Sequence, residues 1–243
     1  DERVVRRYTN LADAATCRVW EKTFAACPRR IVICGQEAGE CAPTLPGGFP
    51  DGCIYLCENL YNGFRLPHAL QGFDALLYAA SQDEKEALAP QLVITYGGHI
   101  VSKRLKQWLR RPPSLIHWHI SPDGDMPDLF GKLTAVFEMS PETFFAHMGQ
   151  CPPPVAPETS EYIRRWREKQ SALPSPEFAY SSMQAIQRLL EALSSTPEHA
   201  TLHLANSSTV RYAGLWPAQP HITVRCNRGV NGIEGSLSTA IGH

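Results

Sequence analysis

Short apolar runs alternate with segments whose apolar residues recur every three to four positions over the first 150 residues. The runs predict buried strands at residues 31–34, 53–56, 92–95, 114–120 and 133–137. The recurring positions predict helices at residues 10–27, 68–80, 103–111 and 141–148. Alternating strands and helices are typical of a parallel sheet that is covered on both faces. We therefore expect residues 1–150 to form an α/β domain with a doubly wound, Rossmann-like parallel sheet.

A proline-rich stretch at residues 151–157 interrupts this alternation, because consecutive prolines neither continue a helix nor serve a central strand. We place a linker at residues 151–175, with one charged helix over residues 161–170. Residues 176–243 then offer an amphipathic helix at 177–193, a strand at 201–204, one further helix–strand step and a turn. This is too little for an α/β domain of ordinary size. We expect a truncated piece of a second α/β domain.

The composition indicates a soluble protein. Lys and Arg total 23 against 24 for Asp and Glu, so no basic field argues for a nucleic-acid partner. No apolar run approaches the roughly 20 residues that a membrane span needs, and the N-terminus has no apolar signal region. We expect a cytoplasmic protein without a membrane span. Eight cysteines form no C-x-x-C pair, which favours reduced, buried thiols over disulfides or zinc.

A glycine-containing turn follows the strand predicted at residues 222–224 and reads CNRGVNGIEG at 226–235. Such a turn brings backbone close to a ligand, and Arg228 stands beside it, where a guanidinium can bind a carboxylate with two hydrogen bonds. A tight strand-to-helix turn is the alternative for the glycines. Arg228 could likewise be solvated or pair with Glu234. The turn leads into residues 237–240, which predict a helix.

Two cations, Lys103 and Arg104, open the helix that follows the strand at residues 92–95, with Ser102 as a possible N-cap. Positive side chains oppose the helix dipole there. They nevertheless add to the free backbone N–H groups at the carboxyl edge of a parallel sheet, and such groups bind anions. The pattern alone leaves a second interpretation open, which is a solvated basic helix face that continues through Lys106.

Ser207 and Arg211 lie four residues apart just after the strand at 201–204. On a helix that begins near Asn206 they would share one face, so that the hydroxyl and the guanidinium could bind one carboxylate. Helix capping is the alternative for Asn206 and Ser208.

Metal and dinucleotide sites have little support, and we predict no metal ligands. His117 and His119 share one face of a strand, a geometry that more often belongs to packed or hydrogen-bonded histidines than to zinc. Asp123, Asp125 and Asp128 are spaced as in part of a calcium loop, but the glutamate that such a loop requires is missing. The glycines after the strand at 31–34 lack the G-x-G-x-x-G spacing of nicotinamide and flavin sites.

Three segments, taken together, resemble one enzyme family. They are PQLVITYGG at residues 90–98 with SKRLKQW at 102–108, LANSSTVRY at 204–212, and the glycine turn at 226–235. They are similar to the central domain and the start of the diphosphate-binding domain of the 2-succinyl-5-enolpyruvyl-6-hydroxy-3-cyclohexene-1-carboxylate synthases. These are thiamine-diphosphate enzymes of menaquinone biosynthesis. The resemblance is diffuse over the N-terminal part of the chain.

The resemblance implies a transferase that decarboxylates 2-oxoglutarate and adds the succinyl-semialdehyde carbanion to isochorismate, with thiamine diphosphate and Mg²⁺ or Mn²⁺ as cofactors. It implies that Gly232 and Ile233 contact the cofactor, and that the Ile233 side chain lies beneath it and keeps it bent. The substrate-binding residues that it implies are Lys103, Arg104, Ser207, Arg211 and Arg228.

The same resemblance implies two parts that this chain lacks. The family's activating glutamate belongs to the N-terminal pyrimidine-binding domain of a neighbouring subunit, and its magnesium-binding aspartate motif would follow residue 243. We interpret the chain as a fragment of a parent that forms a homodimer or homotetramer. We expect the fragment alone to be inactive and to bind no cofactor. We also expect residues after about 194 to be poorly anchored, because strands removed from their sheet leave unpaired edges.

Two alternatives remain. Another thiamine-diphosphate enzyme, of the acetolactate-synthase or decarboxylase type, would share the domain plan. Its less anionic acceptors make Lys103, Arg104 and Arg211 harder to explain. A non-catalytic, Rossmann-like nucleotide-binding module is the second alternative, since the fold by itself permits either function.

Overall fold

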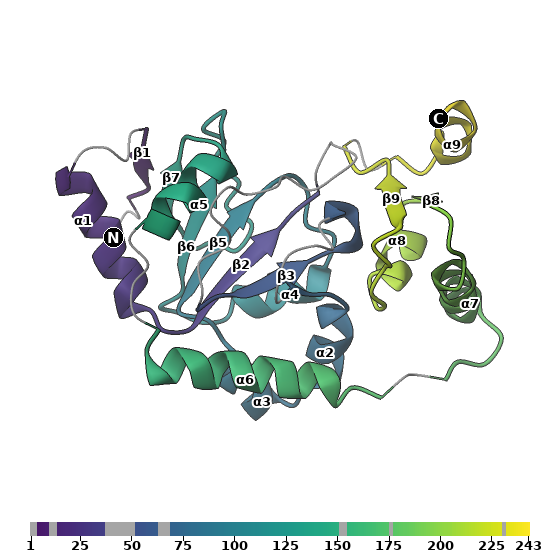
Figure 1. Cartoon of the computed structure of the whole chain (residues 1–243), viewed down its shortest axis with the longest axis horizontal. Coiled ribbons are helices and arrows are strands. Elements are labelled where there is room, and N and C mark those ends of the chain that lie inside the picture. Colours follow the sequence, from purple (N-terminus) through teal and green to yellow (C-terminus); the bar gives the residue numbers. More distant parts are fainter. Residues whose placement is uncertain are drawn as a thin grey trace.

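The computed structural model describes residues 4–9, 14–36, 52–62, 69–150, 155–174, 177–229 and 232–243. They contain one large and one small parallel sheet (Figure 1). The strands of the large sheet are β1 (Arg6–Tyr8), β2 (Arg30–Cys34), β3 (Ile54–Cys57), β4 (Ala69–Leu70), β5 (Leu92–Tyr96), β6 (Ile116–Ile120) and β7 (Leu133–Phe137). Their order is β1-β7-β6-β5-β2-β3-β4, and every neighbouring pair is parallel. The predicted α/β fold with a Rossmann-like parallel sheet is therefore confirmed.

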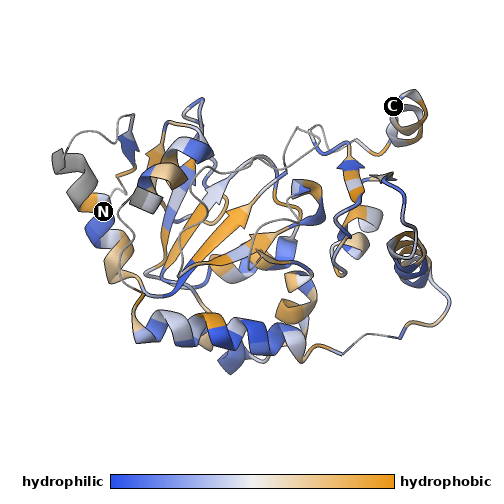
Figure 2. Cartoon of the chain, in the orientation of Figure 1, coloured by the Kyte–Doolittle hydropathy of each residue, from blue (hydrophilic) through white to orange (hydrophobic). Residues whose placement is uncertain are grey.

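Helices cover both faces of the large sheet. One face carries α1 (Ala14–Ala26) and α5 (Pro141–Gln150), and the other carries α2 (Phe73–Ala79), α4 (Lys103–Leu109) and α6 (Pro157–Ser171). Successive residues of a strand point to opposite faces. Val32 of β2 therefore packs with α1 and α5, whereas Ile31 and Ile33 pack with α2, α4 and α6. Because both faces are covered, all five residues of β2 are buried, and Figure 2 shows a correspondingly hydrophobic strand.

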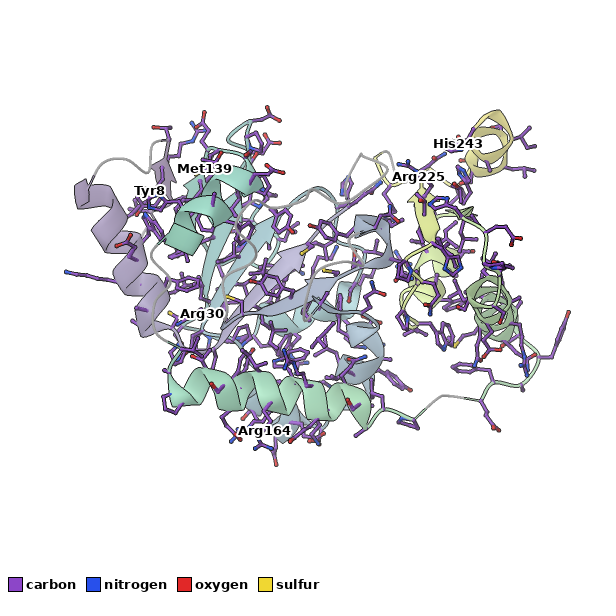
Figure 3. The ribbon with its side chains drawn as sticks, in the orientation of Figure 1. Tyr8, Arg30, Met139, Arg164, Arg225 and His243 are labelled. Carbon is purple, nitrogen blue, oxygen red and sulfur yellow. The ribbon has the colours of Figure 1, made fainter. Side chains whose placement is uncertain are left out.

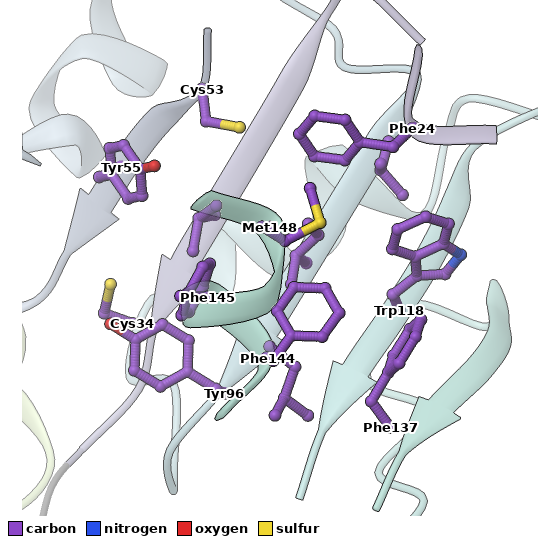
Figure 4. Close-up of a cluster of buried hydrophobic side chains, with 14 of the residues drawn as sticks. Phe24, Cys34, Cys53, Tyr55, Tyr96, Trp118, Phe137, Phe144, Phe145 and Met148 are labelled. Atoms are coloured by element: carbon purple, nitrogen blue, oxygen red, sulfur yellow. The ribbon is translucent and has the colours of Figure 1, made fainter. Parts of the chain in front are cut away.

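Aromatic side chains fill the space beneath α1 and α5. Phe144 and Phe145 of α5 enter this cluster, and Phe144 packs edge-on against Phe137 of β7 with the ring centroids 4.8 Å apart (Figure 4). Phe145 meets Tyr96 of β5 in the same way, at 5.6 Å. Edge-to-face pairs of this kind add to the stabilisation that burial alone gives. The cluster fixes α5 over the middle of the sheet.

The chain reverses its direction of growth at β2, because β3 and β4 lie on one side of it and β5, β6 and β7 on the other. The carboxyl ends of β2 and β5 therefore flank the point at which such sheets usually bind ligands. Here, three backbone N–H groups join the two loops: Gly35 donates to Tyr96 O (2.9 Å), Gln36 to His99 O (3.1 Å) and Gly98 to Gln36 O (2.7 Å). A Cβ atom on Gly35 would overlap the Gly98 carbonyl, so the two backbones are in direct contact.

The helix predicted at residues 68–80 is wrong at its start. Ala69 and Leu70 form β4 beside β3, and the helix begins only at Phe73, after Gly72 in the left-handed conformation (φ 66°). Glycine adopts this conformation without steric cost, so it separates the two elements. Strand β1 and the short helix α3 (Gln82–Ala87) were not predicted from the sequence. The latter begins with a capping box between Ser81 and Glu84, a signal that the sequence does contain.

Helix α6 extends the charged helix predicted at 161–170, and it packs against the large sheet. Tyr162 and Trp166 are buried with α2 and α4, and the Tyr162 hydroxyl donates to Leu88 O at 2.8 Å. Arg164 points away from the sheet and pairs with Glu161 (Figure 3). Residues 151–154, which include three consecutive prolines, and residues 175–176 lie outside the described residues. The boundaries of the predicted linker at 151–175 stay a prediction.

The small sheet consists of β8 (Ala200–Leu204) and β9 (Ile222–Cys226), which pair in parallel. It is accompanied by α7 (Ser182–Ser194), α8 (Ser208–Ala213) and α9 (Ser236–Gly242). Leu60 and Val101 come from the part of the chain that forms the large sheet, yet they are buried with Leu204, Val210 and Val224 of this smaller unit. The two sheets thus share apolar contacts. Weak anchoring after residue 194 stays a prediction, which amide hydrogen exchange would test.

Among the described residues, no helix is both long and apolar enough to cross a bilayer. The described cysteine side chains are all free thiols, and those of Cys27, Cys34, Cys53 and Cys57 are buried. The predicted side-chain state of these cysteines therefore matches the structure.

Candidate functional site

A cavity of about 450 Å³ lies between the carboxyl end of β3, the first turn of α4, and α8. Its walls bring Lys103 and Arg104 of α4 together with Arg211 of α8. The two helices belong to different sheets, and the cavity therefore lies where the two sheets meet. Ser207, Arg228, Gly232 and Ile233, the other predicted site residues, are not among its lining residues.

The start of α4 is held by side chains of the protein itself. Ser102 is the N-cap as predicted, because its hydroxyl accepts a hydrogen bond from Leu105 N at 2.9 Å. The carboxylate of Glu58 accepts the backbone N–H groups of Val101 and Ser102, both at 2.6 Å. The N–H groups of Ser102 and Leu105 are thus used by Glu58 and by the Ser102 hydroxyl, and an anion site at the first turn of α4 stays a prediction.

Arg104 and Lys103 differ in what holds them. The Arg104 guanidinium donates to the carboxylate of Asp74 and lies over the Tyr78 ring, 5.0 Å from its centroid. Asp74 also accepts a hydrogen bond from the Ser102 hydroxyl. The Lys103 side chain is exposed, and no described carboxylate lies within ion-pair distance of its ammonium group. Arg104 is thus fixed in direction, whereas Lys103 can move to meet a ligand.

Arg211 lies on α8, and its Nε atom is buried without a hydrogen-bond partner among the described residues. Helix α8 begins at Ser208, two residues after Asn206. Ser207 is therefore the N-cap residue, with positive φ (71°) and no side-chain cap hydrogen bond, and its side chain is exposed. The face that Ser207 and Arg211 were expected to share is not formed. Ser207 as a substrate ligand stays a prediction.

Asn206 acts as a connector and not as the predicted helix cap. Its amide donates to the carbonyl oxygens of Asn227 and Gly232, and its Oδ1 accepts from Arg228 NH1 at 3.2 Å. Arg228 is only 9 % exposed, and its Nε has no partner among the described residues. A buried donor without a partner is costly. Arg228 is thus positioned by Asn206 and retains an unused donor. The side chain of Ile233, farther along the same turn, is 66 % exposed.

Lys106 belongs to the same cationic region, although the sequence offered it only as part of a solvated helix face. Its ammonium group donates to Ile100 O at 2.9 Å. Burial lowers the pKa of Lys106, the charges of Arg228 and Arg211 lower it further, and the carboxylate of Glu58 opposes them. The electric fields of the arginines on α8 and after β9 therefore reach α4. Only the contact between the two sheets, which the sequence does not reveal, could have identified Lys106.

Glu58 is a second site residue that the sequence analysis missed. It directly follows β3 at the carboxyl edge of the sheet, where functional side chains gather, and that position was the available signal. Burial raises the pKa of Glu58 to about 7, although the N–H groups of Val101 and Ser102 and the charge of Lys106 lower it.

We expect the contribution of Glu58 to the free energy of unfolding to fall as the pH rises from about 4.5 to about 7. Below pH 4.5 the carboxyl is protonated in both states; above it the unfolded chain ionises first, which favours unfolding until the folded carboxyl also ionises. The loss is on the order of 1–3 kcal/mol. Urea denaturation of wild type and Glu58→Gln at several pH values would measure it.

The informative quantity is the difference in the free energy of unfolding between wild type and Glu58→Gln. His119 is present in both proteins, and its titration changes their stability with pH in the opposite direction to that of Glu58. Burial lowers the pKa of His119 to about 4, so that its contribution to stability is lost as the pH falls from about 6.5 to 4. This slope cancels in the difference. A difference that stays constant from pH 4.5 to 7 would show that Glu58 ionises at its ordinary pKa.

The two histidines considered for zinc lie inside the large sheet. His117 Nε2 and His119 Nδ1 are both 2.8 Å from the Thr95 hydroxyl oxygen, as expected for hydrogen-bonded core histidines. The described residues contain no group of three or more His, Cys, Asp and Glu side chains that could hold a metal ion.

Comparison with known proteins finds relatives over most of the chain. No protein-family profile matches. The chain is 46 % identical over 190 residues to the 2-succinyl-5-enolpyruvyl-6-hydroxy-3-cyclohexene-1-carboxylate synthase of Bacteroides thetaiotaomicron. The matched region covers 78 % of the chain and 33 % of the relative. Proteins of the same name from Bacteroides fragilis and Flavobacterium johnsoniae are 51 % identical over 175 residues and 34 % over 226 residues.

These two matches cover 72 % and 88 % of the chain, and 30 % and 39 % of the respective relatives. The chain therefore spans about one third of the length of the curated relatives it matches. The resemblance inferred from the three segments is confirmed.

Proposed function

Because the chain is homologous to part of the 2-succinyl-5-enolpyruvyl-6-hydroxy-3-cyclohexene-1-carboxylate synthases, we propose that it serves the reaction of these enzymes. The protein that contains it would decarboxylate 2-oxoglutarate and join the remaining four-carbon unit to isochorismate, as a transferase of menaquinone biosynthesis. The chain would supply the central domain and the first part of the diphosphate-binding domain.

The convergence of cations from two sheets on one cavity carries this proposal. Each of the two substrates bears two carboxylates, which repel one another unless cations hold them together. Lys103, Arg104 and Arg211 line the cavity, and the charges of Arg211 and Arg228 contribute to the lowered pKa of Lys106. Glu58 and Asp74 line it as well, but both carboxylates are engaged by donors of the protein. Lys103 and Arg211 therefore have no carboxylate partner among the described residues.

Each cation would have a distinct role toward the substrates. Lys103 is exposed and unpaired among the described residues, so it would approach a carboxylate as a mobile charge. Arg104, held by Asp74, would present a fixed guanidinium edge. Arg211 and Arg228 would use their unpartnered Nε atoms, which a carboxylate would satisfy. Ser207 would add a hydroxyl at the start of α8.

Gly232 and Ile233 would hold thiamine diphosphate. The Gly232 carbonyl is fixed by the Asn206 amide, and the exposed Ile233 side chain fits an apolar surface beneath a ring. When bound, thiamine diphosphate supplies the electron sink for decarboxylation and carbon–carbon bond formation. The described residues offer no ligand set for Mg²⁺ or Mn²⁺, so this proposal leaves the metal to the rest of the protein.

We extend the proposal to assembly and location. Turnover would need the remaining two thirds of the relatives' length, including the N-terminal pyrimidine-binding domain of a neighbouring subunit in a homodimer or homotetramer. The chain alone would therefore be inactive. Free thiols at the described cysteines are typical of a reducing compartment and support a cytoplasmic location.

The proposal is tested with the full protein that contains this chain. Given 2-oxoglutarate, isochorismate, thiamine diphosphate and Mg²⁺, it should release carbon dioxide and consume isochorismate in equal amounts, and omission of any one component should abolish both. Pyruvate in place of 2-oxoglutarate is the control. Turnover of pyruvate without isochorismate would instead favour an enzyme of the decarboxylase type.

Among the described residues, the backbone at the ends of β2 and β5 gives no support to the nucleotide-binding alternative. A dinucleotide would place its phosphates against free backbone N–H groups at this point of the sheet. Here the N–H groups of Gly35, Gln36 and Gly98 all donate to carbonyls of the opposite loop.

A further inference from the structure

One short segment, residues 58–62, contacts the two walls of the cavity that carry its cations, α4 and α8. It runs from the end of β3 through the 3₁₀ helix η1 (Asn59–Tyr61) to Asn62. Tyr61 anchors it, because this side chain is fully buried in the core of the large sheet and its hydroxyl is hydrogen-bonded to that of Tyr96. The other side chains of the segment point to different neighbours.

Glu58 and Leu60 bind the wall formed by α4. The Glu58 carboxylate accepts the N–H groups of the two residues that precede Lys103, both at 2.6 Å. Leu60 packs against Val101 in the apolar cluster of the small sheet. The backbone that carries Lys103 and Arg104 is thus fixed relative to the end of β3.

Asn59 binds the wall formed by α8. Its buried amide donates to Ala213 O at 2.9 Å and to Trp216 O at 3.2 Å, at the carboxyl end of that helix. A helix end leaves such carbonyls without intrahelical partners. The amide of Asn59 satisfies them and at the same time fixes the helix that carries Arg211.

Asn62 binds the central residue of β9 as a neighbouring strand would. Its amide donates to Val224 O at 3.0 Å, and its Oδ1 accepts from Val224 N at 2.7 Å. Asn62 has positive φ (55°), a conformation that asparagine tolerates better than most residues. The side chain therefore ties the small sheet to the large one through two hydrogen bonds.

We propose that residues 58–62 are the positioning element of the site, which sets the distance between the cations on α4 and Arg211 on α8. That distance decides how far apart the two carboxylates of a bound dicarboxylate must lie. This inference rests on the proposed function, because it assumes that these cations bind carboxylates. It adds that the asparagines of the segment determine the length of dicarboxylate that the site accepts.

Asn62→Gly is the sharpest variant, because glycine keeps the left-handed backbone and removes only the amide. Asn59→Ala is a second, independent variant. Gln82→Ala is the matched control, since Gln82 is an exposed amide on α3 that lies outside the cavity lining. All are made in the full protein that contains this chain.

The first measurement is hydrogen exchange of backbone amides without ligand. We expect Asn62→Gly to speed exchange about tenfold or more at Val224 and along α8, and to leave β5 and β6 unchanged. Unchanged exchange at Val224 and α8, or an equal increase in β5, would overturn the positioning role. This result does not depend on what the cavity binds.

The second measurement is the affinity for malonate, succinate, glutarate and adipate. A site of fixed width should prefer one length by a factor on the order of ten, and both asparagine variants should reduce this preference to about twofold. An unaltered preference in both variants would overturn the inference while the proposed function stands. Absence of dicarboxylate binding in wild type would instead contradict the proposed function.

Discussion

Trp166→Ala should lower the free energy of unfolding by about 3 to 5 kcal/mol, the usual cost of removing a fully buried indole. The Trp166 side chain has no exposed surface and packs with the apolar residues of α2 and α4. Its ring meets that of Trp108 edge-on, with the centroids 6.0 Å apart. The expected loss is that of the packing contacts of the ring. Urea denaturation monitored by circular dichroism would measure it.

Arg167→Ala is the matched control, because this neighbouring side chain is exposed on the same helix. Its effect should stay within about 0.5 kcal/mol. A loss below about 1 kcal/mol for Trp166→Ala would mean that α6 detaches from the sheet at little cost. The helix would then be part of a linker, as the sequence alone suggested.

The sequence revealed the large sheet because its strands are buried on both faces. Strands such as β2 and β5 read as uninterrupted apolar runs, which differ plainly from the 3.6-residue period of the helices beside them. Helix α6 was harder to place, since its charged face dominates the pattern and only Tyr162 and Trp166 indicate burial. The very short β4 gave no periodic signal at all, and Gly72 was the sole indication of a break.

Residues of the candidate site could be predicted from the sequence only where they belong to a recognisable motif. Lys103, Arg104 and Arg211 stand in recognisable segments, and the structure brings them to one cavity. Asn59 carries no local signal, because the partner of its amide lies 154 residues away in the sequence. Glu58 is indicated only by its place after β3, and its partner Val101 lies 43 residues away. Such long-range hydrogen bonds depend on how two sheets meet.

Asn206 shows how a local rule can mislead. Asparagine before a helix is a good N-cap, and the sequence around residue 206 fits that pattern. In the structure its side chain bonds across to Asn227, Arg228 and Gly232, which follow β9. Pairing of β8 with β9 brings these residues together, and the competing tertiary contacts displace the local cap.

Arg211→Ala and Arg228→Ala should each lower kcat/KM for the synthase reaction roughly tenfold to more than a hundredfold in the full protein. A hydrogen bond between a guanidinium and a carboxylate is worth about 1.5 to 3 kcal/mol, which corresponds to this range. The Nε atoms of both arginines are buried and have no hydrogen-bond partner among the described residues, and a substrate carboxylate would supply one. Steady-state kinetics with 2-oxoglutarate and isochorismate, each varied at saturating concentrations of the other, would measure the losses.

The position of each arginine predicts whether its substitution should change kcat/KM alone or also the melting temperature. Arg211 lines the cavity, so its removal should affect kinetics and leave the melting temperature within a few degrees of wild type. Arg228 also donates to Asn206, and its removal should loosen the turn that carries Gly232. Arg228→Lys keeps the charge without the planar guanidinium and should recover only part of the activity. Arg188→Ala, on the exposed face of α7, is the control that should change neither quantity. Unaltered kcat/KM in both alanine variants would restrict Arg211 and Arg228 to structural roles and contradict the carboxylate site.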